Sequence, residues 1–370
     1  MKLTYGSSRS GIALMMVMIC VTVLGAMAAL FAYSMKVESR LAMNANAEAD
    51  FYPVAQSAVD YCKAVLSAAM TCPEEPFDPQ TGVWGPTMTC SNELLSLIQP
   101  TVDMGRGRKF SWKMRDLESK ANINTADQMM LEQATRLLGV DAGEASTIID
   151  SILDWIDRDD SPRISGTESD YYETLDPPYI AKNGYIDDIS ELLLIKGITP
   201  EMYGVSGMVP PPPPPSLREQ LQMGFEEEYA QRAVLKDLFT PISSGQININ
   251  TASAEVLQLV PFIDEATAQR IIYCRNGQDT GVPVPFRNPG EALTCAQVNP
   301  GVIGQITRYF TVRGRTFEAE IEVECSGVKR YYYAVLARNN QRDIQVLSFY
   351  WKQTPPKKEE MYVSTYAGTR

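Results

Sequence analysis

The sequence predicts an α+β protein built on one long N-terminal helix. Three patterns indicate this fold class: an uncharged apolar run near the N-terminus, a five-residue motif that occurs twice before helical patterns, and alternating strands near the C-terminus. With 370 residues, the chain is long enough for two or three domains beyond the helix.

The apolar run extends from Ile12 to Tyr33 without a charge and follows a short leader with Lys2 and Arg9 that ends at Gly11. About 20 apolar residues cross a bilayer as a helix. The basic leader is expected to stay cytoplasmic, which places the rest of the chain on the other side. A secretory signal peptide would carry its small residue after the apolar core, not before it. We therefore expect the apolar helix to survive processing as a membrane anchor.

Beyond the membrane, apolar residues from Phe51 to Leu66 recur with the spacing of one helical face. This predicts that the helix continues to about residue 69 and packs its outer half on a globular domain. Pro53 is expected to kink or break it.

Strands are predicted where apolar and polar residues alternate. Phe110, Trp112 and Met114 form one such strand, and the stretch from Phe317 to Cys325 alternates with glutamates. Turns at Ser326-Gly327 and Asn339-Asn340 extend the second strand into an antiparallel meander that ends near Trp351.

The duplicated motif is Asn-Ile-Asn-Thr-Ala, at residues 122–126 and 248–252. We expect two related helical units. The predicted helices are Gln128–Leu138, Ala142–Trp155, Ala254–Leu259 and Glu265–Arg275. An additional short hairpin is predicted at Ile189–Tyr203. Pro210 to Pro215 is expected to be an extended linker, followed by a charged helix from about Ser216 to Asp237.

Composition narrows the function classes. The net charge is −12, so phosphate-rich partners such as nucleic acid are not expected. The chain has no histidine, which excludes Ser-His-Asp and Cys-His catalysis in their usual forms and zinc sites that need imidazole. Paired carboxylates could serve a hydrolase, but no nucleophile or substrate-stacking motif accompanies them. We expect no enzyme activity.

Seven cysteines occur, and Cys20 lies in the membrane run. The other six are expected in an oxidising compartment, where disulfides persist. Cys72 with Cys90 and Cys274 with Cys295 are the preferred pairs, because each pair brackets a loop. Cys62 and Cys325 are either a third pair or core thiols.

The order of basic leader, glycine and apolar helix resembles the N-terminus of type IV pilins and type II secretion pseudopilins. The resemblance implies that a prepilin peptidase cuts after Gly11 and methylates Ile12 at its new N-terminus. Most of that family carries glutamate at mature position five, where this chain has Met16. A carboxylate without a partner inside a membrane is costly, so a subunit with no predecessor has reason to lack it. This predicts the first subunit, at the filament tip.

The two helical units resemble helix-hairpin-helix units of DNA-binding proteins, in which a Gly-hydrophobic-Gly turn offers backbone N–H groups to phosphate. The turns here are Gly139-Val140-Asp141, Gly197-Ile198-Thr199 and Phe262-Ile263-Asp264, and none keeps both glycines. A periplasmic DNA-binding protein of a related pilus or uptake machine is the alternative function, and a membrane-anchored hydrolase is the third.

A more specific set of motifs resembles the type II secretion system protein K family, the largest minor pseudopilins. The segments in the order of that family are Ser119 to Thr125, Asp154 to Asp157, Gly166 to Glu168, Tyr171-Tyr172, Pro177 to Tyr179, Lys182-Asn183, Glu191 to Leu194 and Ser244 to Ala252. The resemblance covers about residues 9 to 350, and the proline run, its charged helix and the extra cysteines depart from it.

This resemblance implies a pseudopilin antiparallel β domain with a large inserted α-helical domain of helix-hairpin-helix-like (SAM-like) repeats. It also implies a tip complex with the minor pseudopilins of the I and J classes, whose helices together nucleate growth of the major pseudopilin. We expect a pseudopilus cap, anchored in the inner membrane of a Gram-negative bacterium with its head in the periplasm, that supports export of folded proteins.

An acidic loop follows the second predicted helix. Repulsion between its carboxylates would be relieved by a hard cation, and a flexible loop with several oxygens suits calcium. The family's Asp-Trp-hydrophobic-Asp and Gly-x-Glu motifs favour this reading, while a solvated acidic loop without metal remains open. The expected ligands are Asp154, Asp157, Asp159, Asp160, Glu168 and Asp170.

The expected segments follow from these patterns. They are a leader (1–11), the transmembrane part of the helix (12–33), the outer helix and first pseudopilin part (34–118), a first helical repeat with the acidic loop and Pro-rich linker 209–215 (119–246), a second helical repeat (247–300), C-terminal strands (301–352) and a disordered tail (353–370).

Overall fold

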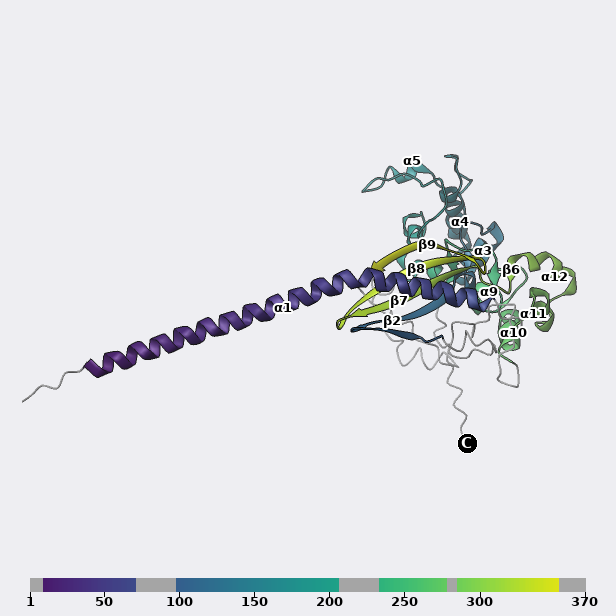
Figure 1. Cartoon of the computed structure of the whole chain (residues 1–370). Coiled ribbons are helices and arrows are strands. Elements are labelled where there is room, and N and C mark those ends of the chain that lie inside the picture. The colour runs from purple at the N-terminus through teal and green to yellow at the C-terminus, as the bar shows by residue number, and fades with distance from the viewer. Residues whose placement is uncertain (1–8, 71–97, 206–232, 278–284, 353–370) are drawn as a thin grey trace, which may run out of the picture.

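The computed structural model describes residues 9–70, 98–205, 233–277 and 285–352. Its longest element is α1 (Arg9–Ala69), which extends as a rod from a head that contains every other element (Figure 1). Residues 12–45 of α1 are exposed along their whole length. This part is long and apolar enough to cross a membrane, as the sequence indicated.

A five-stranded antiparallel sheet lies against the outer half of α1 (Figure 1). Its spatial order is β1-β2-β7-β8-β9, so β2 and β7 are neighbours although the helical domain separates them in sequence. The bounds are β1 (Thr101–Gly105), β2 (Arg108–Asp116), β7 (Thr316–Cys325), β8 (Val328–Asn340) and β9 (Asp343–Lys352). The predicted strands and meander are confirmed.

The core under the sheet follows from the alternation in β2 and β7. Trp112 pairs with Ile321 in the strand register, and Ile321 pairs with Tyr332 of β8. These side chains cover α1 residues from Ala47 to Ala69, which alternate between buried and exposed with the period of a helix. Pro53 lies inside α1 without interrupting it, so the predicted break is wrong.

Arg330 fixes the point at which α1 leaves the head. Its guanidinium forms two hydrogen bonds with the Glu48 carboxylate and lies over the rings of Phe51 and Trp351. The contact joins α1 to β8 and β9, so the rod and the sheet are connected by both apolar packing and a charged anchor.

The helical domain is inserted between β2 and β7 and forms its own core. It consists of a first helical unit (residues 119–242) and a second helical unit (residues 244–312). Each unit begins with the Asn-Ile-Asn motif and is closed by a short parallel strand pair with a Phe-Thr dipeptide. The pairs are β3 (Ala121–Asn122) with β4 (Phe239–Thr240), and β5 (Ile247–Asn248) with β6 (Phe310–Thr311).

The helices of the first unit begin after side-chain caps or at a connecting turn. Asp127, for example, accepts a hydrogen bond from the Met130 N–H at the start of α3. The described helices of this unit are η1 (Leu117–Ser119) just before it, α3 (Gln128–Leu137), α4 (Ala142–Ile156), α5 (Ser169–Tyr172), η2 (Ile189–Leu194), α6 (Pro200–Tyr203) and α8 (Leu235–Leu238).

The second unit repeats this plan. Its helices are α9 (Ala254–Leu257), α10 (Glu265–Arg275), α11 (Pro289–Cys295), α12 (Pro300–Ile306) and η4 (Thr307–Tyr309). The unit continues to residue 312, so the expected boundary at 300 is misplaced: α12 and β6 belong to the helical domain, and the sheet resumes at Thr316. The predicted helix Ala254–Leu259 ends two residues early. The Pro-rich linker and residues 353–370 lie outside the described residues.

Candidate functional site

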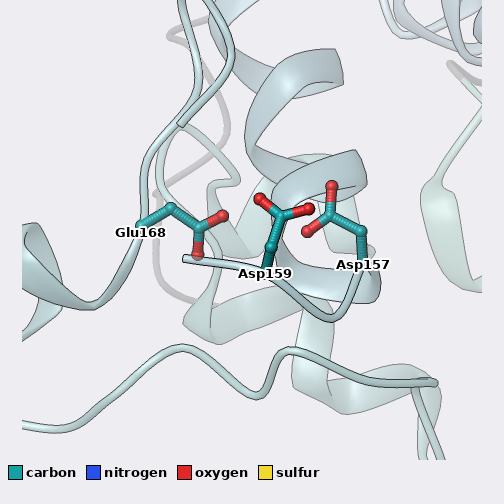
Figure 2. A group of neighbouring side chains, drawn as sticks. All are labelled: Asp157, Asp159 and Glu168. Carbon is teal, nitrogen blue, oxygen red and sulfur yellow. The ribbon is translucent and has the colours of Figure 1, made fainter. Parts of the chain in front are cut away.

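The acidic loop connects α4 to α5 and brings three of the six expected metal ligands together. Oxygen atoms of Asp157, Asp159 and Glu168 lie within 4.8 Å of one another, and Figure 2 shows the three carboxylates side by side. Asp157 is the residue at the C-terminal end of α4, where the helix dipole disfavours negative charge. Mutual repulsion and the dipole both favour positive charge here, and Arg163 Nη1 supplies part of it by pairing with Asp157 Oδ2.

Glu168 is the most constrained of the three. Its side chain is only 4% exposed, and neither carboxylate oxygen has a hydrogen-bond partner among the described residues. Burial, followed by the nearby charges of Asp154, Asp157, Asp160 and Asp159, raises the pKa of Glu168 to about 7. A buried carboxylate without a donor needs either a proton or a cation.

Other oxygens around Glu168 also lack a donor in the described part of the chain. They are Asp157 Oδ1, the Thr167 hydroxyl and the amide oxygen of Asn183, whose backbone adopts a positive φ of 48°. Carboxylate, hydroxyl and amide oxygens are the ligands that calcium accepts in irregular loops. The residues present therefore fit a hard cation.

Asp154 has a different role from the one expected. It is fully buried and accepts hydrogen bonds from Arg163 Nη1 at 2.6 Å and from the Thr167 N–H at 2.8 Å. Gly166 must be glycine here, because a Cβ at that position would lie 1.8 Å from Asp154 Oδ2. Asp154 thus shapes the loop that presents Glu168.

The remaining two expected ligands lie beside the group. Asp160 accepts hydrogen bonds from the Ser169 N–H and from the Asn183 side chain, both at 3.4 Å, and its pKa is lowered by these donors, Ser169 first. Asp170 is exposed on α5 and does not join the group of three. The sequence could not distinguish these roles, because Arg163 and Gly166 set the path of the loop.

The asparagines of the duplicated motif are structural. The first asparagine of each copy accepts a hydrogen bond from the N–H of the second, within one turn. The second asparagine then holds both peptide groups of a distant apolar residue: Asn124 binds the N–H and C=O of Ile186, and Asn250 binds those of Phe286. The motif fixes the internal fold of each unit.

The described part of each unit contains two helical hairpins, and all four of these turns have one residue with positive φ. These residues are Gly139 (71°), Gly197 (87°), Phe262 (68°) and Gln297 (60°). The sequence revealed three hairpins but missed the fourth, between α11 and α12, because Gln297 replaces glycine there. The available signal was the spacing of Asn288-Pro289 and Asn299-Pro300, which cap these two helices.

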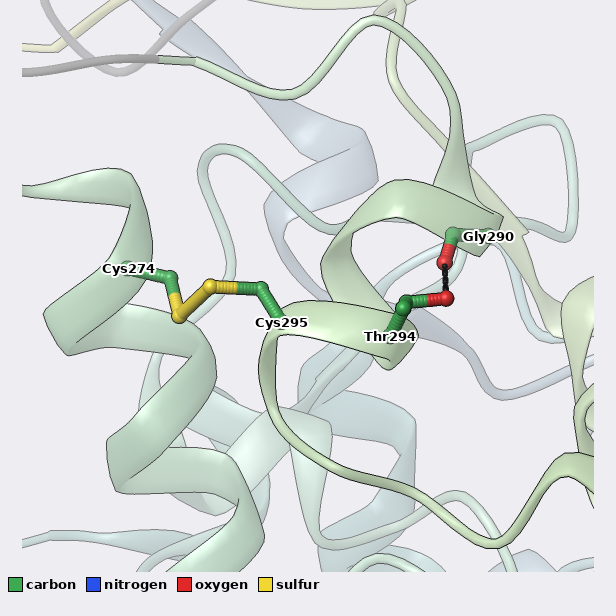
Figure 3. The surroundings of a disulfide bond; sticks show 4 residues. All are labelled: Cys274, Gly290, Thr294 and Cys295. Carbon is green, nitrogen blue, oxygen red and sulfur yellow. Dashed lines mark hydrogen bonds between the residues drawn. A yellow bond between two sulfur atoms is a disulfide. The ribbon is translucent and has the colours of Figure 1, made fainter.

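Cys274 and Cys295 are joined by a disulfide that links α10 to α11 (Figure 3). Close to it, the Thr294 hydroxyl donates a hydrogen bond to the Gly290 carbonyl within α11. Cys62 and Cys325 are buried free thiols in the core between α1 and the sheet. The other preferred pair, Cys72 with Cys90, lies outside the described residues.

The N-terminal junction lies at the start of the rod. Gly11 and Ile12 are in the first turns of α1, and Met16 is 62% exposed on the apolar part. The described part of the chain thus presents the apolar helix without a covering element.

Comparisons with known proteins agree with these features. The family model described as type II secretion system (T2SS), protein K, matches residues 113–205, which contain the acidic loop. A putative type II secretion system protein K of Escherichia coli K12 is 33% identical over 110 residues, or 26% of this chain and 34% of that protein. The type II secretion system protein K of Pectobacterium carotovorum is 25% identical over 193 residues, or 45% of this chain and 58% of that protein.

The fold extends the likeness over most of the molecule. A crystal structure of the GspK-GspI-GspJ complex from enterotoxigenic Escherichia coli contains a chain that matches with a TM-score of 0.59 and 17% identity, covering 84% of this chain and 100% of that one. The chain is thus similar in sequence to type II secretion system protein K over residues 113–205, and similar in fold to a chain of that complex over most of its length.

The matched segments span 34% and 58% of the two curated relatives. A helix-hairpin-helix motif model matches residues 243–311, which are almost the whole second helical unit of this protein K relative. That match independently supports an end of the unit beyond residue 300.

Proposed function

We propose that this protein K relative caps the tip of the type II secretion pseudopilus, starts its assembly and thereby supports export of folded proteins. The observation that carries the proposal is the combination of an uncovered apolar rod with a head enlarged by two helical units. The rod suits packing among other pseudopilin helices in the inner membrane. The head is too large to repeat easily along a thin filament, so it suits an end.

Met16 supports the tip position. In a filament of this kind, a glutamate at mature position five would pair with the N-terminal amine of the preceding subunit. A subunit at the tip has no preceding subunit, so a carboxylate there would be left without a partner in the membrane. Burying it there would cost on the order of 3 kcal/mol. An uncharged Met16 removes that cost.

The proposed partners are the minor pseudopilins of the I and J classes, because the similar solved chain was crystallised in a complex with GspI and GspJ. The major pseudopilin would assemble below this complex, and a prepilin peptidase would process the N-terminus. We place the head in the periplasm and the rod in the inner membrane.

The DNA-binding alternative is not favoured, and the hairpin turns supply a reason. Asp141 and Asp264 precede α4 and α10, where a phosphate would need to approach the helix N-terminus. Asp264 already accepts the hydrogen bond from the Thr267 N–H at 2.8 Å. A negative charge that occupies this position repels phosphate and removes a donor.

The N-terminal part of the proposal is tested by replacing Gly11 with leucine. A bulky side chain at the cleavage point should block processing, so the variant should keep its leader and fail to restore secretion in a strain that lacks the native chain. Replacing Gly25, which has open space around it, by alanine is the matched control and should be processed normally. Normal processing and secretion by the Gly11 variant would contradict the pilin-like N-terminus.

We also propose that the acidic loop binds calcium through Asp157, Asp159 and Glu168. The unpartnered oxygens of Glu168 and Asp157 support this choice, and Asp154 supports it indirectly by holding the loop. When bound, the cation would neutralise the carboxylates and tie the loop to the end of α4. Its contribution would be to the stability of the first helical unit, with no catalytic step.

Calcium-dependent melting of the full chain in detergent tests the site. We expect calcium to raise the melting temperature of the wild type relative to chelator, and Glu168→Gln to remove most of this increase. Asp170→Asn, an exposed change in the same loop region, should keep the full increase. Equal melting of the wild type with calcium and with chelator would eliminate the site, and elemental analysis would show whether calcium copurifies.

A further inference from the structure

The sheet and the two helical units meet at a single junction. The chain leaves β2 there at residues 116–119, passes between the units at 243–245 and returns to β7 at 313–316. Two acidic side chains lie at this crossing: Asp116 is 5% exposed and Glu118 is 0% exposed. Carboxylates are seldom this deeply buried without a cation, so their contacts need an explanation.

Glu118 joins the other two crossing segments. One carboxylate oxygen accepts a hydrogen bond from the Ser244 N–H at 3.0 Å, and the other accepts from the N–H groups of Arg315 and Thr316 at 2.9 and 2.8 Å. Backbone N–H groups can only donate, so all three contacts require Glu118 oxygens that accept.

Asp116 joins the sheet to the second copy of the duplicated motif. Its Oδ1 accepts from the Glu118 N–H at 2.9 Å, while its Oδ2 receives the Asn248 amide at 2.7 Å and the Thr251 hydroxyl at 2.8 Å. Gly314 makes this packing possible, because a Cβ there would lie 2.7 Å from Asp116 Oδ1. The contacts of Asp116 therefore connect β2, η1 and the second unit.

No ion pair reaches either carboxylate among the described residues. The charged side chains on the surrounding elements have other contacts: Arg115 pairs with Glu320, Lys120 donates to the Lys236 carbonyl, and Arg338 donates to the Gly314 carbonyl. The other charged residues around the junction are Arg313 and Glu318, which are half-buried, and Arg315, whose side chain is exposed.

Two adjacent buried carboxylates without a cation cannot both remain charged at low cost. All three partners of Glu118 are backbone N–H groups, which can only donate, whereas the Thr251 hydroxyl beside Asp116 Oδ2 can also accept, so Asp116 is the one that can carry a proton. Burial raises the pKa of Asp116 well above its ordinary value, and the charge and hydrogen bond of Glu118 raise it further, against smaller opposing effects of Thr251 and Asn248.

We propose that Asp116 and Glu118 share one proton, held on Asp116, and that this proton locks the helical domain onto the sheet. Loss of the proton would place two negative charges in one buried site and weaken all three crossings together. The junction is thus a pH-sensitive lock between the sheet and the two helical units.

The sign of the effect follows from proton linkage. The folded chain keeps a proton on Asp116 that the unfolded chain releases at its ordinary pKa of about 4. The stabilisation is therefore complete below about pH 4 and is lost progressively as the pH rises through the higher pKa of the folded state. Alkaline pH should therefore weaken the junction between the sheet and the two helical units.

The test uses the full chain in detergent micelles, melted at several pH values from about 5 to about 9. We expect the wild-type melting temperature to fall by a few degrees across this range and the fall to be smaller in Asp116→Asn, whose amide stays neutral. Asp264→Asn, an exposed helix cap whose pKa is lowered, is the matched control and should retain the wild-type slope. An Asp116→Asn variant with an undiminished slope would overturn the proposal.

A second readout keeps the proposal testable if Asp116→Asn folds poorly. Isotope-edited infrared spectra of wild-type protein with labelled aspartate should contain a protonated carboxylic acid band at neutral pH that disappears on alkaline titration. A spectrum with only ionised aspartate at neutral pH would also overturn the proposal.

Discussion

Single asparagines organise both helical units from within. Asn250 is 1% exposed, and its side chain receives the Phe286 N–H at 2.9 Å and donates to the Phe286 carbonyl at 3.0 Å. Phe286 lies 36 residues further along the chain and outside the helices and strands. The Asn250 side chain therefore supplies partners for both the N–H and the C=O of this residue. Asn124 does the same for Ile186 in the first unit.

Replacing Asn250 with alanine should therefore be costly. The change leaves a buried N–H and a buried C=O without partners, and each such group costs about 1–3 kcal/mol, so we expect a loss of about 2–4 kcal/mol in the free energy of unfolding. Denaturant unfolding of the full chain measures it. Asn339→Ala removes an exposed hydrogen bond and should cost less than about 0.5 kcal/mol. Equal losses of unfolding free energy in the two variants would refute this role of Asn250.

At the scale of elements, regular alternation made the sheet predictable. Glutamates at every second position of β7 leave Phe317, Ile321 and Val323 on one face, and the structure buries all three against α1. Helix α10 was predicted with its observed ends because Asp264 caps it and an apolar face follows. Both cases depend on patterns within one element, which a sequence displays directly.

Contacts between elements were less predictable. The fourth hairpin escaped notice because Gln297 occupies its left-handed turn, and the domain boundary was then placed at 300 instead of after 312. In the acidic loop the composition indicated a cation, but Asp154 is bound by Arg163, which lies nine residues further along the chain, and the same guanidinium also pairs with Asp157. Such long-range choices are set by packing and not by local periodicity.

At the scale of the whole molecule, the chain divides into a rod, a sheet and a doubled helical domain, with an anchor at each joint. Arg330 fixes the rod to the sheet, and the Asp116–Glu118 pair fixes the sheet to both helical units. The proposed tip role requires that these joints hold the three parts together.

The most direct measurement of the proposed tip role is co-purification of the full-length chain with the minor pseudopilins of the I and J classes, co-expressed in membranes and extracted in mild detergent. The account predicts one stable complex containing all three proteins, which also forms in the absence of the major pseudopilin. A chain that purifies alone while the I- and J-class subunits still associate with each other would contradict it.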